Sequence, residues 1–143
     1  MAQKEWVRQI FQIVLVVNDV EEVLENWKRD VEFDQSSISC GYTDLTKYAE
    51  FDFGGVDLKL VEPRNKDGYD TYARALRDKG QGFHHIGIYS DDYTGLMDHF
   101  KALGFSQVAD EEIDDVRLKI FNFEKETGLS VGIYDEMFGP CAR

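Results

Sequence analysis

The feature that most constrains the fold of this chain is an internal repeat with an offset of 73 residues. The segment 11–19 aligns with 84–92, and the segment 55–60 aligns with 128–133 at the same offset. The pair Trp27-Lys28 also falls on Phe100-Lys101. One offset shared by three separate segments predicts two copies of a single supersecondary unit.

Each copy begins with a predicted strand that is followed by a predicted helix. Residues 11–17 are short and rich in β-branched side chains, which is typical of strands, and residues 84–89 align with them in the second copy. Asp19 and Asp92 come next, where an N-cap residue would begin a helix. Apolar residues then recur with helical spacing. They are Val20, Val23, Leu24 and Trp27 in the first copy, and Leu96, Met97, Phe100 and Leu103 in the second.

Further strands complete each copy. Residues 48–53 and 56–62 are separated by Gly54-Gly55, a pair that favours a tight hairpin. Residues 116–123 and 129–135 repeat this pattern around Thr127-Gly128. A helix over 69–79 that is ended by Gly80 connects the copies. The 143 residues therefore suit one domain. We expect module one at about 8–66, the connecting helix at about 67–80, and module two at about 81–138.

Side chains alternate between the two faces of a strand, so each predicted strand has two distinguishable faces. Four strands at equivalent positions of the repeat have one aliphatic face, which suits packing against the helices. The opposite faces carry Gln12, Val14 and Val16; Asp57, Lys59 and Val61; His85, Gly87 and Tyr89; and Ser130, Gly132 and Tyr134. A polar strand face is often simply solvated. A largely apolar surface with a few polar groups is typical of a ligand site.

Three segments resemble sequences of the vicinal-oxygen-chelate proteins. Residues 12–19 are similar to their "H-I-x-I-x-V-x-D" opening, and residues 58–63 resemble their "I-E-L-L-E-P" strand. Residues 80–88 resemble the "G-E-G-x-H-H-I-A-F" segment of the methylmalonyl-CoA epimerase and glyoxalase branch. The resemblance extends from about residue 10 to 136. It implies an α+β fold in which two tandem βαβββ modules form a cup-shaped mixed sheet.

The resemblance also implies four metal ligands, one from each of four strands. The matching positions hold Gln12, Lys59, His85 and Gly132, where the family has His, Glu or Gln, His, and Glu. Lysine is normally a cation and glycine has no side chain, so two ligands are missing. We therefore predict no metal and no other cofactor. The alternative is a metal held by Gln12, His85 and a carboxylate such as Asp57 or Glu136.

The chemistry shared by this family is stabilisation of a negative charge on a substrate oxygen. Lys59 would stabilise an enolate by its charge, and His85 would act as the base. A second acid or base would be Tyr42, Asp44 or Tyr134. The predicted catalytic residues are His85, Lys59, Tyr134 and Asp44. The predicted substrate-binding residues are Gln12, Val14, Tyr42, Asp57, Val61, Gly87, Tyr89, Phe121 and Gly132.

The remaining histidines and cysteines receive no catalytic role. Strict alternation on the strand would point His84 away from the site if His85 points into it. His99 is predicted on the surface of a helix. Cys40 and Cys141 form no CxxC motif, and no export or membrane-spanning segment is evident. A reducing, cytoplasmic setting is therefore expected.

The charge of the chain limits the partners that we expect. With 16 basic and 28 acidic residues, the net charge of −12 disfavours nucleic acids, anionic membranes and the phosphates of coenzyme A. A neutral aromatic ketone fits better, and the chain resembles the metal-free racemases of isoflavanones such as dihydrodaidzein. We predict a homodimeric, metal-independent racemase or epimerase. The alternatives are a non-catalytic protein that sequesters a small molecule, or a metal-dependent methylmalonyl-CoA epimerase or glyoxalase.

Overall fold

The computed structural model describes residues 9–113, 116–123 and 129–134. The first module contains β1 (Gln9–Val16), α1 (Val20–Asp30), the 3₁₀ turn η1 (Gln35–Ser37), β2 (Ser39–Tyr42), β3 (Thr46–Phe53) and β4 (Val56–Pro63). After α2 (Thr71–Lys79), the second contains β5 (Gly82–Tyr89), α3 (Tyr93–Ala102), β6 (Ser106–Ile113), β7 (Val116–Phe123) and β8 (Leu129–Tyr134). Apart from η1, both modules are βαβββ units, as the repeat predicts.

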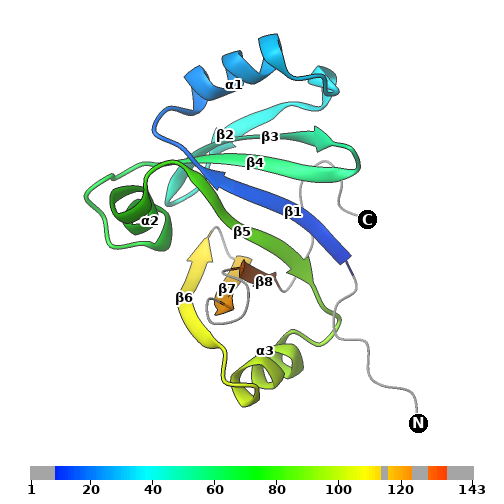
Figure 1. Ribbon diagram of the computed structural model, residues 1–143, viewed down its shortest axis with the longest axis vertical. Coiled ribbons are helices and arrows are strands. Elements are labelled where there is room, and N and C mark those ends of the chain that lie inside the picture. Colours follow the sequence, from blue (N-terminus) through cyan, green and yellow to red (C-terminus); the bar gives the residue numbers. More distant parts are fainter. Residues whose placement is uncertain (1–8, 114–115, 124–128, 135–143) are drawn as a thin grey trace.

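The strands form one mixed sheet of eight strands in the order β2-β3-β4-β1-β5-β8-β7-β6 (Figure 1). Within each module the first strand pairs in parallel with the last strand, β1 with β4 and β5 with β8. The two modules join through the antiparallel pair of β1 and β5. The first strands of the two repeats therefore lie side by side at the centre of the sheet.

Local sequence signals set most element boundaries. The side chain of Asp19 accepts a hydrogen bond from the backbone N–H of Glu22, and Asp92 accepts one from Gly95, so both predicted N-caps are confirmed. Gly54 and Gly55 both have positive φ, 70° and 93°, as a tight hairpin of this kind requires.

Two predicted helix boundaries differ from those in the structure. The connecting helix begins at residue 71 rather than 69, because Asp70 is its N-cap and accepts hydrogen bonds from the N–H groups of Tyr72 and Ala73. In the second module, Leu103 lies just beyond the end of α3 and is 57% exposed, so it is not part of the buried stripe. In the part of the chain that the structure describes, no helix has the length and apolarity needed to cross a bilayer.

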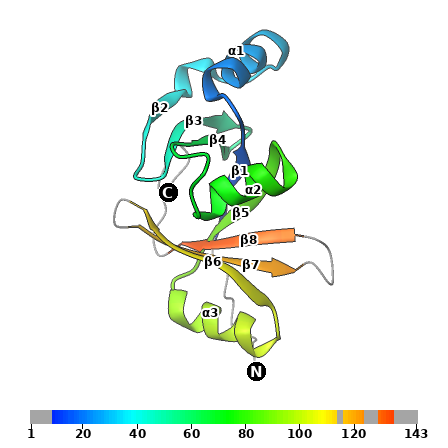
Figure 2. The ribbon, with the colours of Figure 1, turned by 90° about the vertical axis from the view of Figure 1, so that its left-hand side faces the viewer.

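The helices α1 and α3 cover the outer face of the sheet, at opposite ends of the molecule (Figure 2). In the first module, Val20 and Leu24 of α1 pack with Phe51 and Leu60 of the sheet. In the second module, Leu96 of α3 packs with a similar aliphatic group, which consists of Ile88, Val131 and Ile133. The aliphatic strand faces predicted from the sequence are therefore the faces that contact these two helices.

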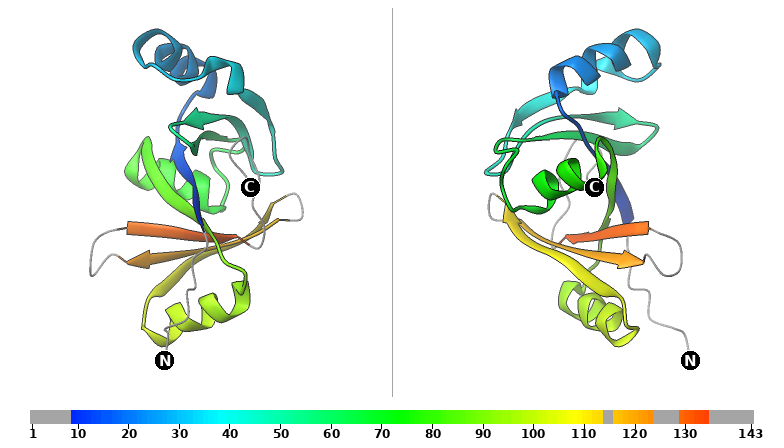
Figure 3. Two further views of the ribbon diagram at one scale, coloured as in Figure 1. Left: turned by 90° about the vertical axis from the view of Figure 1, so that its right-hand side faces the viewer. Right: turned by 60° about the vertical axis from the view of Figure 1, so that its left-hand side comes forward.

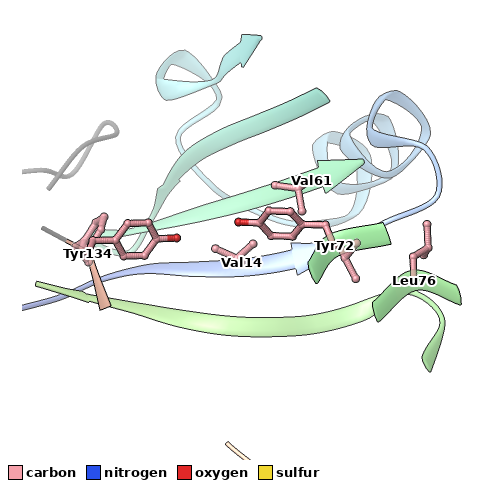
Figure 4. Close-up of a cluster of buried hydrophobic side chains, with 7 residues drawn as sticks. Val14, Val61, Tyr72, Leu76 and Tyr134 are labelled. Atoms are coloured by element: carbon pink, nitrogen blue, oxygen red, sulfur yellow. The ribbon is translucent and has the colours of Figure 1, made fainter. Parts of the chain in front are cut away.

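The connecting helix α2 lies on the other side, within the curve of the sheet (Figure 3). Its residues Tyr72 and Leu76 pack with Val14, Val16 and Val61 in a third buried cluster. Figure 4 shows the phenol ring of Tyr72 directed toward that of Tyr134, with Val14 between them. We call this side of the sheet the inner face.

The pairing of β1 with β5 contains two irregularities that change which side chains reach the inner face. One lies between Ile10 and Gln12, and the other is opposite His84, between the pairs Val14–His85 and Leu15–Phe83. An extra residue in one strand is a β-bulge, which breaks the alternation of side chains. Our expectation that strict alternation turns His84 away from the site is therefore wrong: His84 is buried on the same side as His85, and the two rings are hydrogen-bonded to each other.

Candidate active site

Four side chains form a row across the inner face, on four adjacent strands. In the pairing register, Glu50 of β3 is opposite Lys59 of β4, Lys59 is beside Val14 of β1, and Val14 is beside His85 of β5. Glu50 and His85 are buried, and Lys59 is half-buried. Because neighbouring strands are about 4.8 Å apart, the backbones at the two ends of the row are separated by about 14 Å. The inner face thus places a carboxyl group, an ammonium group and an imidazole in line.

A second row runs alongside the first and contains two glycines. Gln12 pairs with Asp57 on one side and with Gly87 on the other, and Gly87 pairs with Gly132. A Cβ atom on Gly87 would lie 2.9 Å from the ring of Tyr134 and 3.1 Å from Cβ of Gln12. Only glycine at position 87 therefore leaves room for the Tyr134 ring and the Gln12 side chain to lie on either side of it.

A chain of hydrogen bonds links β8, β5 and α2. The hydroxyl of Tyr134 lies 2.8 Å from Nε2 of His85. Nδ1 of His85 lies 2.8 Å from Nδ1 of His84. Nε2 of His84 lies 3.3 Å from the carbonyl oxygen of Thr71 and 3.2 Å from its hydroxyl. Both nitrogens of both histidines are engaged, and Tyr72 packs on the His84 ring at a centroid distance of 4.7 Å.

Burial keeps both histidines neutral. It lowers the pKa of His84 to about 4, although the hydrogen bond to the Thr71 backbone opposes this shift. Burial also lowers the pKa of His85 well below its usual value, and the neighbouring His84 and Lys59 lower it further. At neutral pH, His85 is therefore an uncharged imidazole that can accept a proton.

The lowered pKa values predict that acid destabilises the fold. In the unfolded chain the histidines bind protons below about pH 6.5, whereas folded His84 binds one only below about pH 4. Neutral His84 therefore contributes its full share of the folding stability above pH 6.5, and this contribution is lost as the pH falls to 4. We expect the His84 contribution to the free energy of unfolding to drop by about 3 kcal/mol over this range.

Urea unfolding of the wild type and of His84→Asn, at pH 7 and pH 4.5, measures this contribution. The variant should lose much less stability between the two pH values. Glu50 acts in the opposite direction, because its raised pKa favours the folded state as the pH falls, but this term is common to both proteins. Equal pH dependence in the two proteins would contradict the assignment to His84.

The carboxyl and ammonium groups of the row influence each other. Burial raises the pKa of Glu50, the charge of Lys59 opposes that shift, and Asp57 adds to it. Nζ of Lys59 lies 4.6 Å from the centre of the Tyr48 ring, so the aromatic face also stabilises the cation. Among the described residues, no hydrogen-bond partner lies near Oε2 of Glu50. The row therefore combines a cation with a carboxyl group whose pKa is raised.

The side-chain amide of Gln12 makes no hydrogen bond to any of the described residues. It is fully buried, and neither its Nε2 nor its Oε1 has a hydrogen-bond partner within the described residues. A buried amide without partners typically costs about 1–3 kcal/mol. Such a group at the centre of the inner face is suited to bind a polar atom of a ligand.

The residues at the family's four ligand positions do not fit a divalent metal. Gln12 and His85 have suitable donors, but Lys59 brings a positive charge and Gly132 brings no side chain. Elsewhere in the described residues, no three His, Cys, Asp or Glu side chains converge in the way that a metal ion requires. Glu136, named above as an alternative ligand, lies outside the described residues.

Several residues predicted for the site lie together on the inner face, and others do not. The structure places Gln12, Val14, Asp57, Lys59, Val61, His85, Gly87, Gly132 and Tyr134 there, and the register puts Tyr89 on the same side of β5. Tyr42 is paired with Lys47 on the opposite side of β2, is 64% exposed, and lines a surface hollow beside α1. Asp44 lies in the exposed bend after β2. The Phe121 side chain lies outside the described residues.

The site also contains four residues that were not predicted from the sequence: Glu50, His84, and Thr71 and Tyr72 of α2. The alternation of segment 48–53 contains the signal for Glu50, because Ala49 and Phe51 are apolar while residues 48, 50 and 52 share the other face. No sequence signal marks the bulge at His84. The inward position of α2 depends on the curvature of the whole sheet.

Comparison with known proteins agrees with this architecture. Residues 11–121 match the model of the Glyoxalase/Bleomycin resistance protein/Dioxygenase superfamily. This match spans more than half of the chain, and the chain therefore belongs to that superfamily. No curated protein sequence matches it significantly.

Solved structures with the same fold include methylmalonyl-CoA epimerases. The enzyme from Mycobacterium tuberculosis is similar with a TM-score of 0.70 at 12% identity, over 96% of this chain and 94% of that one. A Streptomyces coelicolor variant in complex with 2-nitronate-propionyl-CoA has a TM-score of 0.67 at 15% identity, over 90% and 97%. A hypothetical protein from Bacillus halodurans has a TM-score of 0.70 at 16% identity, over 91% and 95%. At these identities the similarity establishes the fold alone.

Proposed function

We propose that this protein is a metal-independent racemase or epimerase that acts on a carbon next to a carbonyl group. The observation that carries this proposal is the row formed by Glu50, Lys59, Val14 and His85. A ligand above Lys59 and Val14 would have the Glu50 carboxyl group on one side and the His85–Tyr134 pair on the other. In a two-base inversion at carbon, proton donors or acceptors lie on both sides of a planar intermediate, and a positive charge near the oxygen stabilises that intermediate.

Each group has a defined part in the proposed reaction. The α C–H bond breaks, its proton passes to the Tyr134 oxygen, and the Tyr134 proton moves to Nε2 of His85, so no buried phenolate forms. The electron pair of the C–H bond becomes the enolate, whose oxygen lies near the Lys59 ammonium. The Glu50 carboxyl group, whose pKa is raised, then gives a proton to the opposite face of the carbon. Proton exchange with solvent restores both groups, and the reverse reaction uses the same path.

The substrate that we propose is a small neutral aromatic ketone, of the isoflavanone type. The buried cluster on the inner face is largely aliphatic and aromatic, with Phe11, Tyr72 and Tyr134 among its members. The net charge of −12 opposes a ligand as anionic as an acyl-CoA thioester. The Streptomyces coelicolor epimerase structure contains such a thioester analogue, so this preference would separate the present protein from that relative.

Deuterium incorporation from D₂O tests the proposal. We expect the purified protein to exchange the α-hydrogen of at least one chiral α-aryl ketone, with loss of optical activity, and to act poorly on methylmalonyl-CoA. Because the residues at the ligand positions do not fit a metal, the rate should be unchanged after dialysis against EDTA. NMR detects the exchange and circular dichroism follows the inversion.

Two other results would identify the alternatives. Ligand binding without any exchange would indicate a protein that sequesters small molecules. Loss of exchange in EDTA, with recovery on adding cobalt, nickel or manganese, would indicate a metal-dependent enzyme and would refute the role of Lys59.

A further inference from the structure

His84 lies behind His85, the imidazole to which the proposed function assigns the proton, and is not itself a member of the row. It is buried between His85 and the first residue of α2, Thr71. It faces His85 through Nδ1 and Thr71 through Nε2. This position suggests control of His85 rather than contact with a ligand.

The proton positions in the hydrogen-bond chain from Tyr134 to Thr71 follow from whether each group can donate or accept. Nε2 of His84 lies 3.3 Å from the Thr71 carbonyl oxygen, which only accepts hydrogen bonds, and 3.2 Å from the Thr71 hydroxyl, which can donate or accept. A proton on Nε2 suits both contacts, whereas a lone pair there would face the carbonyl oxygen, so we infer that Nε2 of His84 carries the proton. A neutral ring has a single N–H, and Nδ1 of His84 is therefore an acceptor. The only proton available for the 2.8 Å contact between the two Nδ1 atoms then belongs to His85.

The proton on His85 also sets the direction of its hydrogen bond with Tyr134. If Nδ1 of His85 carries its proton, Nε2 of His85 is unprotonated and accepts a hydrogen bond from the Tyr134 hydroxyl at 2.8 Å. All hydrogen bonds are then donated in one direction, from the Tyr134 hydroxyl to His85, from His85 to His84, and from His84 to the Thr71 carbonyl. The β-bulge makes this possible, because two consecutive residues of a regular strand would point to opposite faces.

We propose that His84 is a positioning residue that holds the proton on Nδ1 of His85 and thereby keeps the Nε2 lone pair directed at Tyr134. The effect on turnover rests on the proposed function, whereas the proton positions do not. In histidines generally, the hydrogen bond made by one ring nitrogen determines whether the other nitrogen is protonated.

The first test is direct observation of the protonated nitrogens in the full chain. Two-dimensional ¹H–¹⁵N spectra of labelled wild-type protein at pH 7 should show His85 protonated at Nδ1 and His84 protonated at Nε2. The opposite assignment for either ring overturns the proposal. Because this measurement needs no substrate, it stands even if the protein proves to have no racemase activity.

The second test uses two variants of His84. Asparagine places an amide oxygen near the position of Nδ1 and retains an acceptor for His85, whereas leucine fills similar space without one. We expect His84→Leu to lose the Nδ1–H form of His85 and to lower kcat for deuterium exchange by about 10-fold to 10²-fold, with little change in KM. His84→Asn should keep the Nδ1–H form and remain within a few-fold of the wild type.

The outcomes separate the two proposals. Exchange by the wild type together with an unchanged kcat in His84→Leu would overturn the role of His84 and leave the racemase intact. Absence of exchange in the wild type would remove the proposed function, and the spectra alone would then decide the proton positions. If His84→Leu does not fold, the wild-type spectra and the rate of His84→Asn decide, since a large loss of kcat in the asparagine variant would contradict the proposal.

Discussion

Lys59→Met should lower the rate of α-proton exchange by about 10²–10³, the usual cost of removing one preorganised group that stabilises an oxyanion. Methionine keeps most of the volume and the apolar contact with Tyr48, over whose ring the lysine ammonium lies. The loss would therefore come from the missing charge. Single-turnover deuterium exchange, followed by NMR, measures it directly.

Lys47→Met is the matched control. Lys47 lies on β3, on the outer face, where its ammonium pairs with Glu21 of α1 at 2.6 Å. Removing this cation changes the net charge by the same amount, so the exchange rate should remain near that of the wild type. A wild-type rate in Lys59→Met would instead transfer the oxyanion role to Gln12 or Tyr134.

Combining Lys59→Met with His85→Ala strengthens this test. Loss of the base should by itself lower the rate by about 10²–10⁴. If the two groups serve one transition state, the double variant should be much less impaired than the product of the two single losses predicts. Independent, multiplicative losses would mean that Lys59 and His85 do not act in the same step.

Glu50→Gln should strongly slow inversion while sparing part of the exchange. The amide keeps the shape of the carboxyl group but removes its transferable proton, so we expect racemisation to fall by about 10²–10⁴. The His85–Tyr134 side remains able to remove and return the proton of one enantiomer. That enantiomer should therefore still take up deuterium, with retention of configuration. Chiral chromatography and NMR on each enantiomer separate the two processes.

Asp52→Asn provides the comparison for Glu50→Gln. Asp52 is two residues further along β3 on the same side, and its carboxylate accepts a hydrogen bond from the backbone of Gly55, which asparagine can retain. Its inversion rate should be unaffected. If Glu50→Gln lost deuterium exchange equally for both enantiomers, the Glu50 carboxyl group would not act on only one face of the substrate carbon.

The sequence was sufficient for the parts of the fold that depend on local periodicity. Strand alternation predicted the inner face of β1 and β4, and the helical stripes and Asp N-caps predicted α1 and α3. The strand pairing confirms that Lys59 and His85 lie on the same face, two strands apart. These features follow from residues close together in the chain, and the 73-residue offset relates the two halves.

The parts that escaped prediction depend on non-local pairing. The bulge at His84 results from how β5 aligns with β1 and leaves no local mark in the sequence. The pairing of Glu50 with Lys59 requires the register of the β3–β4 hairpin. Tyr42 was expected at the site, but β2 pairs with β3 so that Gly41 rather than Tyr42 is on the side of Tyr48.

The inward position of α2 has a consequence for how such a protein is built from repeated halves. Thr71 and Tyr72 belong to neither repeat, yet they contact the histidine pair from within the curve of the sheet. A dimer of two separate half-length chains would reproduce the strands but would have no covalently placed helix to contact His84. The peptide that fuses the duplicated units thus supplies parts that neither duplicate encodes, and its length and composition are constrained like those of the strands.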